Sequence, residues 1–173
     1  MIAEQLKKSI LQAAIQGKLT QQLPEDGDAR DLLKEIQKEK ARLIKEGKIK
    51  KEKPLPEITE DEIPFEIPEN WCWARIGNVF YLQAGKFTSS SSINSSGKYP
   101  CYGGNGLRGY VDSYNRSGRF PLIGRQGALC GNINIADGKF YATEHAVVAE
   151  LFSNCMPDWA SYFLKALNLN QYS

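Results

Sequence analysis

The sequence is poor in the residues that build metal centres. Its 173 residues include four cysteines and a single histidine, His145, and no two cysteines form a CxxC pair. A structural zinc ion needs four Cys, His or carboxylate ligands at short spacings, so no zinc site is expected. Cys72, Cys101, Cys130 and Cys155 are widely separated, and a chain of this length can bury a core without disulfides. Four separate reduced thiols are predicted.

Long apolar runs are absent as well. No stretch approaches the roughly 18 apolar residues that span a bilayer, and the N-terminus MIAEQLKKSI lacks the pattern of a secretory signal. With 42% hydrophobic and 24% charged residues, the composition is typical of a globular protein and excludes a disordered or collagen-like chain. A cytoplasmic protein with no membrane partner is predicted.

Positive charge is concentrated in the middle of the chain, although the net charge is only +2. Residues 1–62 hold 13 basic and 13 acidic side chains, whereas residues 86–125 hold six basic side chains and one acid, Asp112. The six are Lys86, Lys98, Arg108, Arg116, Arg119 and Arg125. Such a local excess favours binding of a polyanion. The alternative is a scatter of cations that face different directions.

Residues 1–53 are predicted to form two helices. An apolar residue recurs every four positions from Ile2 to Ala14, and Gly17 offers a stop. Asp28 can cap a second helix, which carries a heptad-like seam. The seam positions are Ala29, Leu33, Ile36, Lys40, Leu43 and Gly47. About two and a half heptads need a partner, so we expect an antiparallel helical hairpin or pairing with another chain.

The amino-acid composition of the chain changes after residue 53. Residues 54–66 are rich in proline and acids and should form an extended linker. Residues 67–173 are predicted as an α+β domain with a twisted mixed sheet, because ten of the fifteen glycines lie in 97–138 beside the short β-like runs FPLIG, NINIA and HAVVAEL. Trp71 and Trp73 alternate as in a buried strand. The run PDWASYFLKALNL indicates a closing helix with an apolar face. This face would comprise Trp159, Tyr162, Phe163 and Ala166.

The segment GNGLRGYV at 104–111 matches the GxGxxG pattern of nucleotide-binding proteins. A dinucleotide fold needs a helix directly after the glycines, but YVDSYNRSG follows, and a kinase would need further motifs that the chain lacks. A nucleotide-binding enzyme is therefore disfavoured. A compact hairpin that presents aromatic, amide and arginine side chains explains the glycines better.

Several side chains on and near this hairpin could contact DNA. Arg108 suits a guanine edge, and Asn105 or Gln126 suits adenine. We assign base contacts to Tyr102, Asn105, Arg108, Arg125 and Gln126, and phosphate contacts to Lys86, Lys98, Arg116 and Arg119. Tyr110 is also counted among the DNA-binding residues.

Each assignment has a structural alternative. Tyr102 and Tyr110 could be packed strand residues, and Arg125 could pair with Asp112 or Glu144. Glu144 and His145 could form an acid–base pair, but a hydrogen-bonded core histidine is the better interpretation, and no catalytic residue is assigned.

The order of five segments resembles the DNA-specificity (S) subunits of type I restriction-modification systems. The segments are LKKSILQAAIQGKLT, EIPFEIPENWCWARIGNVF, YPCYGGNGLRGY, IGRQGALCGNIN and FYATEHAVV. The resemblance implies a non-catalytic subunit whose target recognition domain reads one half of a split DNA sequence. It also implies coiled-coil helices that dock methyltransferase (M) subunits, and a restriction (R) subunit that joins through the complex. S-adenosylmethionine and ATP would bind those partners, so no cofactor is expected here.

The chain also departs from the family pattern. Members usually carry two recognition domains over more than twice this length, whereas this chain has one and lacks the long helix after it. It is therefore either truncated or a half-subunit that restores the two-domain arrangement as a homodimer with a symmetric split target. Another possibility is a scaffold or decoy that binds methyltransferase subunits without recognising DNA.

Overall fold

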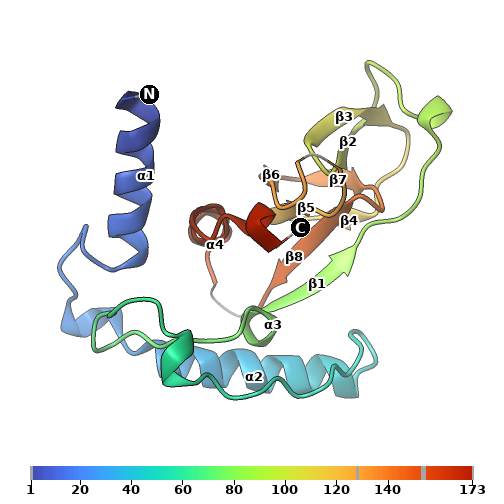
Figure 1. The fold of residues 1–173 in the computed structure, drawn as a ribbon. Helices are drawn as coiled ribbons and strands as arrows, with labels where there is room; N and C mark the ends of the chain where they lie inside the picture. Colours follow the sequence, from blue (N-terminus) through green and yellow to red (C-terminus); the bar gives the residue numbers. More distant parts are fainter. Residues whose placement is uncertain (1, 128, 153–154, 173) are drawn as a thin grey trace. The chain divides into compact units, whose positions relative to one another are not determined.

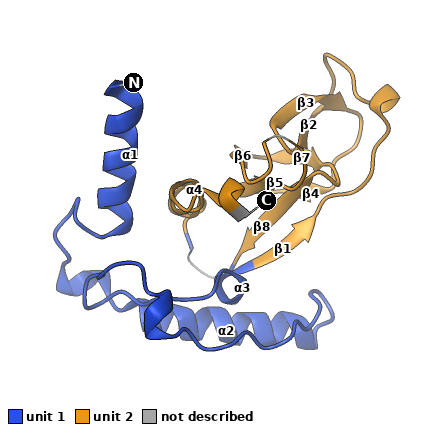
Figure 2. Ribbon diagram, viewed as in Figure 1, with its two compact units in different colours: residues 1–80, 152–155 blue, residues 81–151, 156–173 orange. Residues whose placement is uncertain are grey.

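The computed structural model describes residues 2–127, 129–152 and 155–172, which form two compact units (Figures 1 and 2). The first comprises Met1–Phe80 with Phe152–Cys155, and the second comprises Tyr81–Leu151 with Met156–Ser173. Helices dominate the first unit and strands the second, which confirms the predicted α+β class. The compact units divide after Phe80. The predicted linker at 54–66 remains a prediction.

Both predicted N-terminal helices form. Helix α1 runs over Ile2–Ile15, and Gly17 beyond its end has a φ of 69°. Helix α2 runs over Ala29–Lys45 and begins after a short 3-10 turn at Pro24–Asp26. The Asp28 side chain caps α2 by accepting a 2.7 Å hydrogen bond from the Arg30 backbone N–H. Local capping and turn signals therefore determine where α2 begins.

The seam of α2 packs within its own unit. Ile36 is its buried residue, and the helix packs chiefly against the short helix α3, Ile76–Val79. Lys40, the polar seam position, donates to the Gly77 carbonyl and pairs with Glu52 at 2.7 Å. Helix α1 has no buried residue: Ile2, Leu6 and Ile10 are exposed, Ile2 at 84%, whereas Ala14 is half-buried. The chain downstream of residue 54, rather than α1, therefore covers the seam.

The mostly irregular segment before α3 contains contacts that bring Arg75 close to residues 56–62. Arg75 pairs with Glu62 at 2.6 Å and donates to the Pro56 and Glu57 carbonyls. A short 3-10 turn lies at Glu60–Glu62. The prediction of a strand at Trp71 and Trp73 is wrong: these residues lie in irregular backbone, because both indoles have specific partners there. One donates to Gln22, and the other contacts Phe65 edge-on.

The second unit contains two four-stranded sheets (Figure 1). One has the order β1-β8-β5-β6, and the other has the order β3-β2-β7-β4 with a parallel β2–β7 pairing. The strands are β1 Phe80–Ala84, β2 Tyr99–Gly103, β3 Gly106–Val111, β4 Arg116–Ser117, β5 Phe120–Gly124, β6 Ile133–Ala136, β7 Lys139–Ala142 and β8 Ala146–Leu151. A 3-10 turn lies at Ser90–Ser92. The mixed sheet and the strands FPLIG, NINIA and HAVVAEL are thus confirmed.

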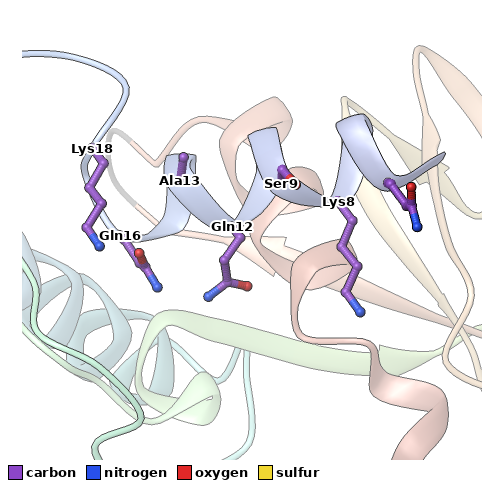
Figure 3. Close-up of a pocket in the computed structure, with 7 residues that line it drawn as sticks. Lys8, Ser9, Gln12, Ala13, Gln16 and Lys18 are labelled. Atoms are coloured by element: carbon purple, nitrogen blue, oxygen red, sulfur yellow. The ribbon is translucent and has the colours of Figure 1, made fainter. Parts of the chain in front are cut away.

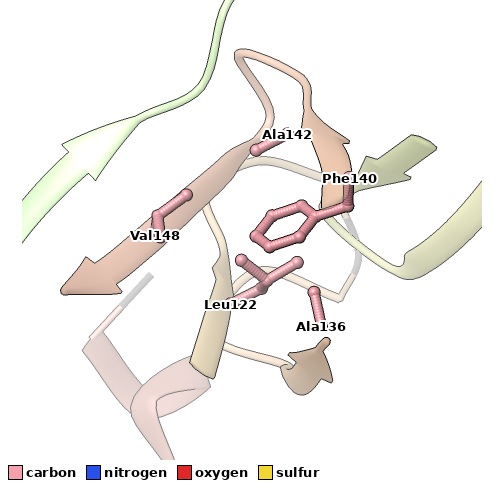
Figure 4. Packing of buried hydrophobic residues seen from close by; sticks show 5 residues of the cluster. All are labelled: Leu122, Ala136, Phe140, Ala142 and Val148. Carbon is pink, nitrogen blue, oxygen red and sulfur yellow. The ribbon is translucent and has the colours of Figure 1, made fainter. Parts of the chain in front are cut away.

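The core of this unit joins strands of both sheets (Figure 4). Phe140 on β7 is fully buried and lies against Leu122 on β5, and Val148 on β8 completes the cluster with two alanines. Full burial of such side chains contributes about 1.5–3 kcal/mol each. This apolar contact holds the strands whose connecting loops carry the candidate site.

Helix α4, Pro157–Ala166, closes the second unit and is followed by a 3-10 turn at Leu169–Tyr172. The predicted helix is confirmed, but its predicted apolar face is wrong. Ala160, Ser161 and Leu164 are buried, whereas Trp159 and Tyr162 are exposed. Small residues allow closer packing against the sheet than an indole would. Within the described residues, no helix is long and apolar enough to cross a membrane.

Candidate nucleic-acid interface

Three connections between strands converge at one place in the second unit. They are the β2–β3 turn at 104–105, the described residues 125–127 and 129–132 of the β5–β6 loop, and the β7–β8 loop at 143–145, which we together call the loop cluster. A Cβ atom on Gly104 would lie 3.1 Å from the His145 carbonyl oxygen and 3.2 Å from that of Gln126. A Cβ atom on Gly124 would meet the Gly104 carbonyl oxygen. Glycine at these positions therefore permits the loops to approach each other.

Polar side chains connect the three loops. The Asn132 amide donates to Asn105 Oδ1 at 3.1 Å, which links the β5–β6 loop to the β2–β3 turn. His145 Nδ1 lies 2.9 Å from Gln126 Oε1, and His145 Nε2 lies 3.1 Å from Glu144 Oε1. His145 is thus hydrogen-bonded as predicted, but it is half-exposed rather than a core residue. The cluster brings predicted base-reading residues from distant parts of the sequence together.

Two predicted base-reading arginines belong to this region and remain free of carboxylates. Arg108 on β3 is exposed, and the carbons of its side chain pass over Gly103. Arg125 donates its backbone N–H to the His145 carbonyl, while its side chain is exposed. Among the residues that the structure describes, no carboxylate lies within ion-pair distance of either guanidinium, so the alternative pairing of Arg125 with Asp112 or Glu144 does not occur. Both arginines can therefore accept an anionic or base-edge partner.

A second group of cations lies beside tyrosine rings. Lys98 Nζ is 5.3 Å from the Tyr99 ring centroid, and Lys139 Nζ is 4.9 Å from that of Tyr114. The two rings are 5.0 Å apart, so the four side chains form a lysine–tyrosine row. Lys139 and Tyr114 were not among the predicted DNA contacts, because only the pairing of β2 with β7 brings residue 139 near residue 99. Lys86, another predicted phosphate contact, is exposed on the chain after β1.

Arg116 and Arg119, unlike these cations, are paired with carboxylates. Arg116 is half-buried, lies 3.2 Å from Glu150 and donates to Gln83. Burial raises the pKa of Glu150, and the neighbouring guanidinium opposes that rise. Arg119 pairs with Asp137 at 2.7 Å and with Asp158 at 2.6 Å. These ion pairs compete with any phosphate, so the geometry favours a structural role for both arginines.

Tyr102 and Tyr110, both predicted to contact DNA, make contacts within the protein instead. The Tyr102 ring packs edge-on against Phe140 at 5.7 Å, and burial raises its pKa. Tyr110 exchanges two 2.9 Å backbone hydrogen bonds with Asn94, which ties the serine-rich segment at 88–96 to β3. The packed-strand alternative therefore describes both positions better than base contact.

The described residues offer no cluster of three or more His, Cys, Asp or Glu that could hold a metal ion. The four cysteines are free, and Cys101, which is fully buried, has its thiol pKa raised by burial. The GxGxxG glycines lie in the antiparallel β2–β3 hairpin, which lacks the helix that would face a pyrophosphate. The geometry thus provides hydrogen-bonding and cationic groups at the loop cluster.

A surface hollow also lies along α1 in the first unit (Figure 3). Its lining consists of Gln5, Lys8, Ser9, Gln12, Ala13, Gln16 and Lys18. Figure 3 shows the Lys8, Gln12 and Gln16 side chains on the same side of the helix. Amide and lysine groups from a single helix provide no acid, base or nucleophile arrangement, so we assign no site here.

Comparison with known proteins identifies the sheet-rich region. A family model described as the type I restriction modification DNA specificity domain matches residues 68–173. Over 102 residues the chain is 48% identical to the specificity subunit of the type I restriction enzyme EcoprrI from Escherichia coli, covering 57% of this chain and 25% of that subunit. Over 92 residues it is 51% identical to the EcoAI specificity subunit from the same organism, covering 53% and 16%. The matches thus cover about a quarter or less of these relatives.

A solved structure shares the fold. The crystal structure of the type I restriction-modification S subunit from M. genitalium aligns with a TM-score of 0.51 at 23% sequence identity. The alignment covers 61% of this chain and 29% of that one. At this identity the similarity shows a common fold and carries no residue roles.

Proposed function

Because the chain belongs to the type I restriction modification DNA specificity family, we propose that its second unit recognises a specific duplex DNA sequence and that the chain itself is not catalytic. The observation that carries this proposal is the loop cluster. Exposed amides and Arg125 extend from loops held in place by backbone and amide contacts, and Arg108 extends from the adjoining strand β3; neither arginine has a carboxylate partner among the described residues. Side chains of this kind, in a rigid setting, suit hydrogen bonding to base edges.

The proposed roles follow from which side chains are free. Arg108 and Arg125 contact guanine or phosphate, and Asn105 and Gln126 contact base edges. The lysine–tyrosine row and Lys86 supply phosphate contacts, which fix the register without carrying sequence information. Tyr102, Tyr110, Arg116 and Arg119 are left out, because their rings, backbone or charges are engaged within the protein.

The finer assembly is also a proposal. One recognition domain reads one half of a split target, and the helices of the first unit dock M subunits that bind S-adenosylmethionine. An R subunit that consumes ATP then joins through the complex. A homodimer with a symmetric split target would supply the other half-site.

Arg108→Ala tests the recognition role, with Arg119→Ala as the matched control. A duplex selected from a randomised library is compared with its scrambled version by fluorescence anisotropy. Arg108→Ala should reduce discrimination between the two by about 1–3 kcal/mol. Arg119→Ala should leave discrimination unchanged, because Asp137 and Asp158 already hold that guanidinium.

Two outcomes would contradict the proposal. If the unmodified chain binds selected and scrambled duplexes equally, it does not recognise sequence. If Arg119→Ala loses discrimination while Arg108→Ala keeps it, the assignment of free and engaged arginines is wrong. Binding to M subunits without any duplex affinity would instead support the scaffold alternative.

A further inference from the structure

His145 occupies a position that no recognition role yet explains. It is the single histidine of the chain, and its ring lies between the Gln126 amide and the Glu144 carboxylate. Gln126 is exposed and belongs to the proposed base-reading set. The protonation of His145 can therefore affect the orientation of the Gln126 amide, which is proposed to contact a base.

The chemistry of the two contacts couples the imidazole to the amide. A carboxylate oxygen only accepts hydrogen bonds, so the 3.1 Å contact with Glu144 Oε1 places a hydrogen on His145 Nε2. If the ring is neutral, Nδ1 then carries a lone pair and must accept from the Gln126 NH2 group. If the ring is protonated, Nδ1 also donates and holds Gln126 Oε1, as at the observed 2.9 Å.

The two states present opposite edges of Gln126 to a partner. With protonated His145 the amide offers its NH2 donor outward, and with neutral His145 it offers its carbonyl acceptor. We propose that His145 is a positioning residue whose protonation selects whether the NH2 group or the carbonyl of the Gln126 amide faces the base pair. This inference rests on the proposed function. A donor favours guanine or thymine edges in the major groove, whereas an acceptor favours adenine or cytosine.

Contacts between the loops hold His145 and Gln126 in place. Arg125 donates its backbone N–H to the His145 carbonyl at 2.9 Å, which anchors the β7–β8 loop to the β5–β6 loop. Glu144 Oε2 is buried and lacks a hydrogen-bond partner among the described residues, so the imidazole is the group that compensates this carboxylate. The charged side chains on the segments that pack here are Glu144, Arg125, Arg108 and Lys86, whose backbone is bridged to Thr143 of the β7–β8 loop.

The experiment has two readouts on the full chain. Because His145 is the single histidine, the 15N resonances of its ring report its protonation and tautomer without assignment ambiguity. Duplex selection from a randomised library is then run at about pH 5.5 and about pH 8, on the two sides of the range in which histidine titrates. Wherever the 15N spectrum shows a neutral ring, we expect its hydrogen on Nε2, and we expect the base preference at one position to change about five- to tenfold between the two pH values.

Glu144→Gln is the near-isosteric variant, and Asp112→Asn is its matched control. Glu144→Gln should give the same base preference at both pH values, because its amide NH2 can donate to Nε2, and the neutral ring then keeps its hydrogen on Nδ1 and still holds Gln126 Oε1. Asp112 is exposed and has no place in the cluster, so its variant should behave as the parent chain does. In the parent chain, a neutral ring with its hydrogen on Nδ1 would overturn the inference.

The failure of the inference can be told apart from failure of the proposed function. Sequence-specific binding with a base preference independent of pH overturns the role of His145 and leaves the recognition function standing. Equal binding to selected and scrambled duplexes at both pH values overturns both.

Discussion

The approach of the loops at Gly124 provides a sharp test of the site. Gly124 has an ordinary backbone conformation, so alanine there meets no dihedral penalty. Its Cβ would instead meet the Gly104 carbonyl oxygen and lie 2.9 Å from that of Leu129. Both obstacles are backbone atoms and cannot rotate away, so the β2–β3 turn must move away from the β5–β6 loop. Overpacking of this kind costs about 1–3 kcal/mol.

Gly127→Ala is the matched control in the same loop. Its Cβ would meet no atom within 4 Å, but its φ of 90° lies in the left-handed region. That conformation costs a non-glycine residue about 1–2 kcal/mol. The two variants should therefore lose similar stability by different mechanisms. Only Gly124→Ala separates the loops.

Urea unfolding and duplex selection together distinguish the two effects. Both variants should lower the urea midpoint by roughly 1 M. Only Gly124→Ala should also lose preference for the selected duplex, because it displaces Asn105 from the partner that holds it. Retention of the full preference by Gly124→Ala would refute the view that contact between the loops creates the reading surface.

Two further predictions concern the two units separately. Phe140→Ala should cost about 3–5 kcal/mol in urea unfolding, because the ring is fully buried between strands of both sheets, whereas the exposed Leu82→Ala should change it by less than about 0.5 kcal/mol; a small loss for Phe140→Ala would contradict the assigned core. Hydrogen bonds from Arg75, and next from the Thr59 backbone, lower the pKa of Glu62 from 4.5 to about 2. Stability from this carboxylate is therefore present above pH 4.5 and lost as the pH falls toward 2, so Glu62→Gln should flatten the pH dependence of the urea midpoint in that window; an unchanged slope would show that the ion pair does not contribute.

Local signals in the sequence predicted most elements of the fold. The cap at Asp28, the glycines of the β2–β3 hairpin and the apolar runs of β5 and β8 each act over a few residues, so spacing alone identifies them. The irregular path of Trp71 was not predictable in this way, because Gln22 determines it from 49 positions away.

The candidate site was only partly predictable for the same reason. A local count of charge treats Arg108 and Arg119 as equivalent. The fold separates them, because Asp158, 39 residues away, reaches Arg119, while Arg108 meets no carboxylate among the described residues. Lys139 lay outside the basic segment and joins Lys98 only through strand pairing. Contacts between residues far apart in the sequence decide whether a cation has a carboxylate partner, and local residue spacing does not predict such contacts.

Hydrogen exchange on the full chain, with and without its selected duplex, measures the binding surface directly. The account predicts that amides of the β2–β3 turn, the β5–β6 loop and the β7–β8 loop become protected together when the duplex binds. Protection confined to α1, α2 or the serine-rich segment, with the three loops unchanged, would contradict it.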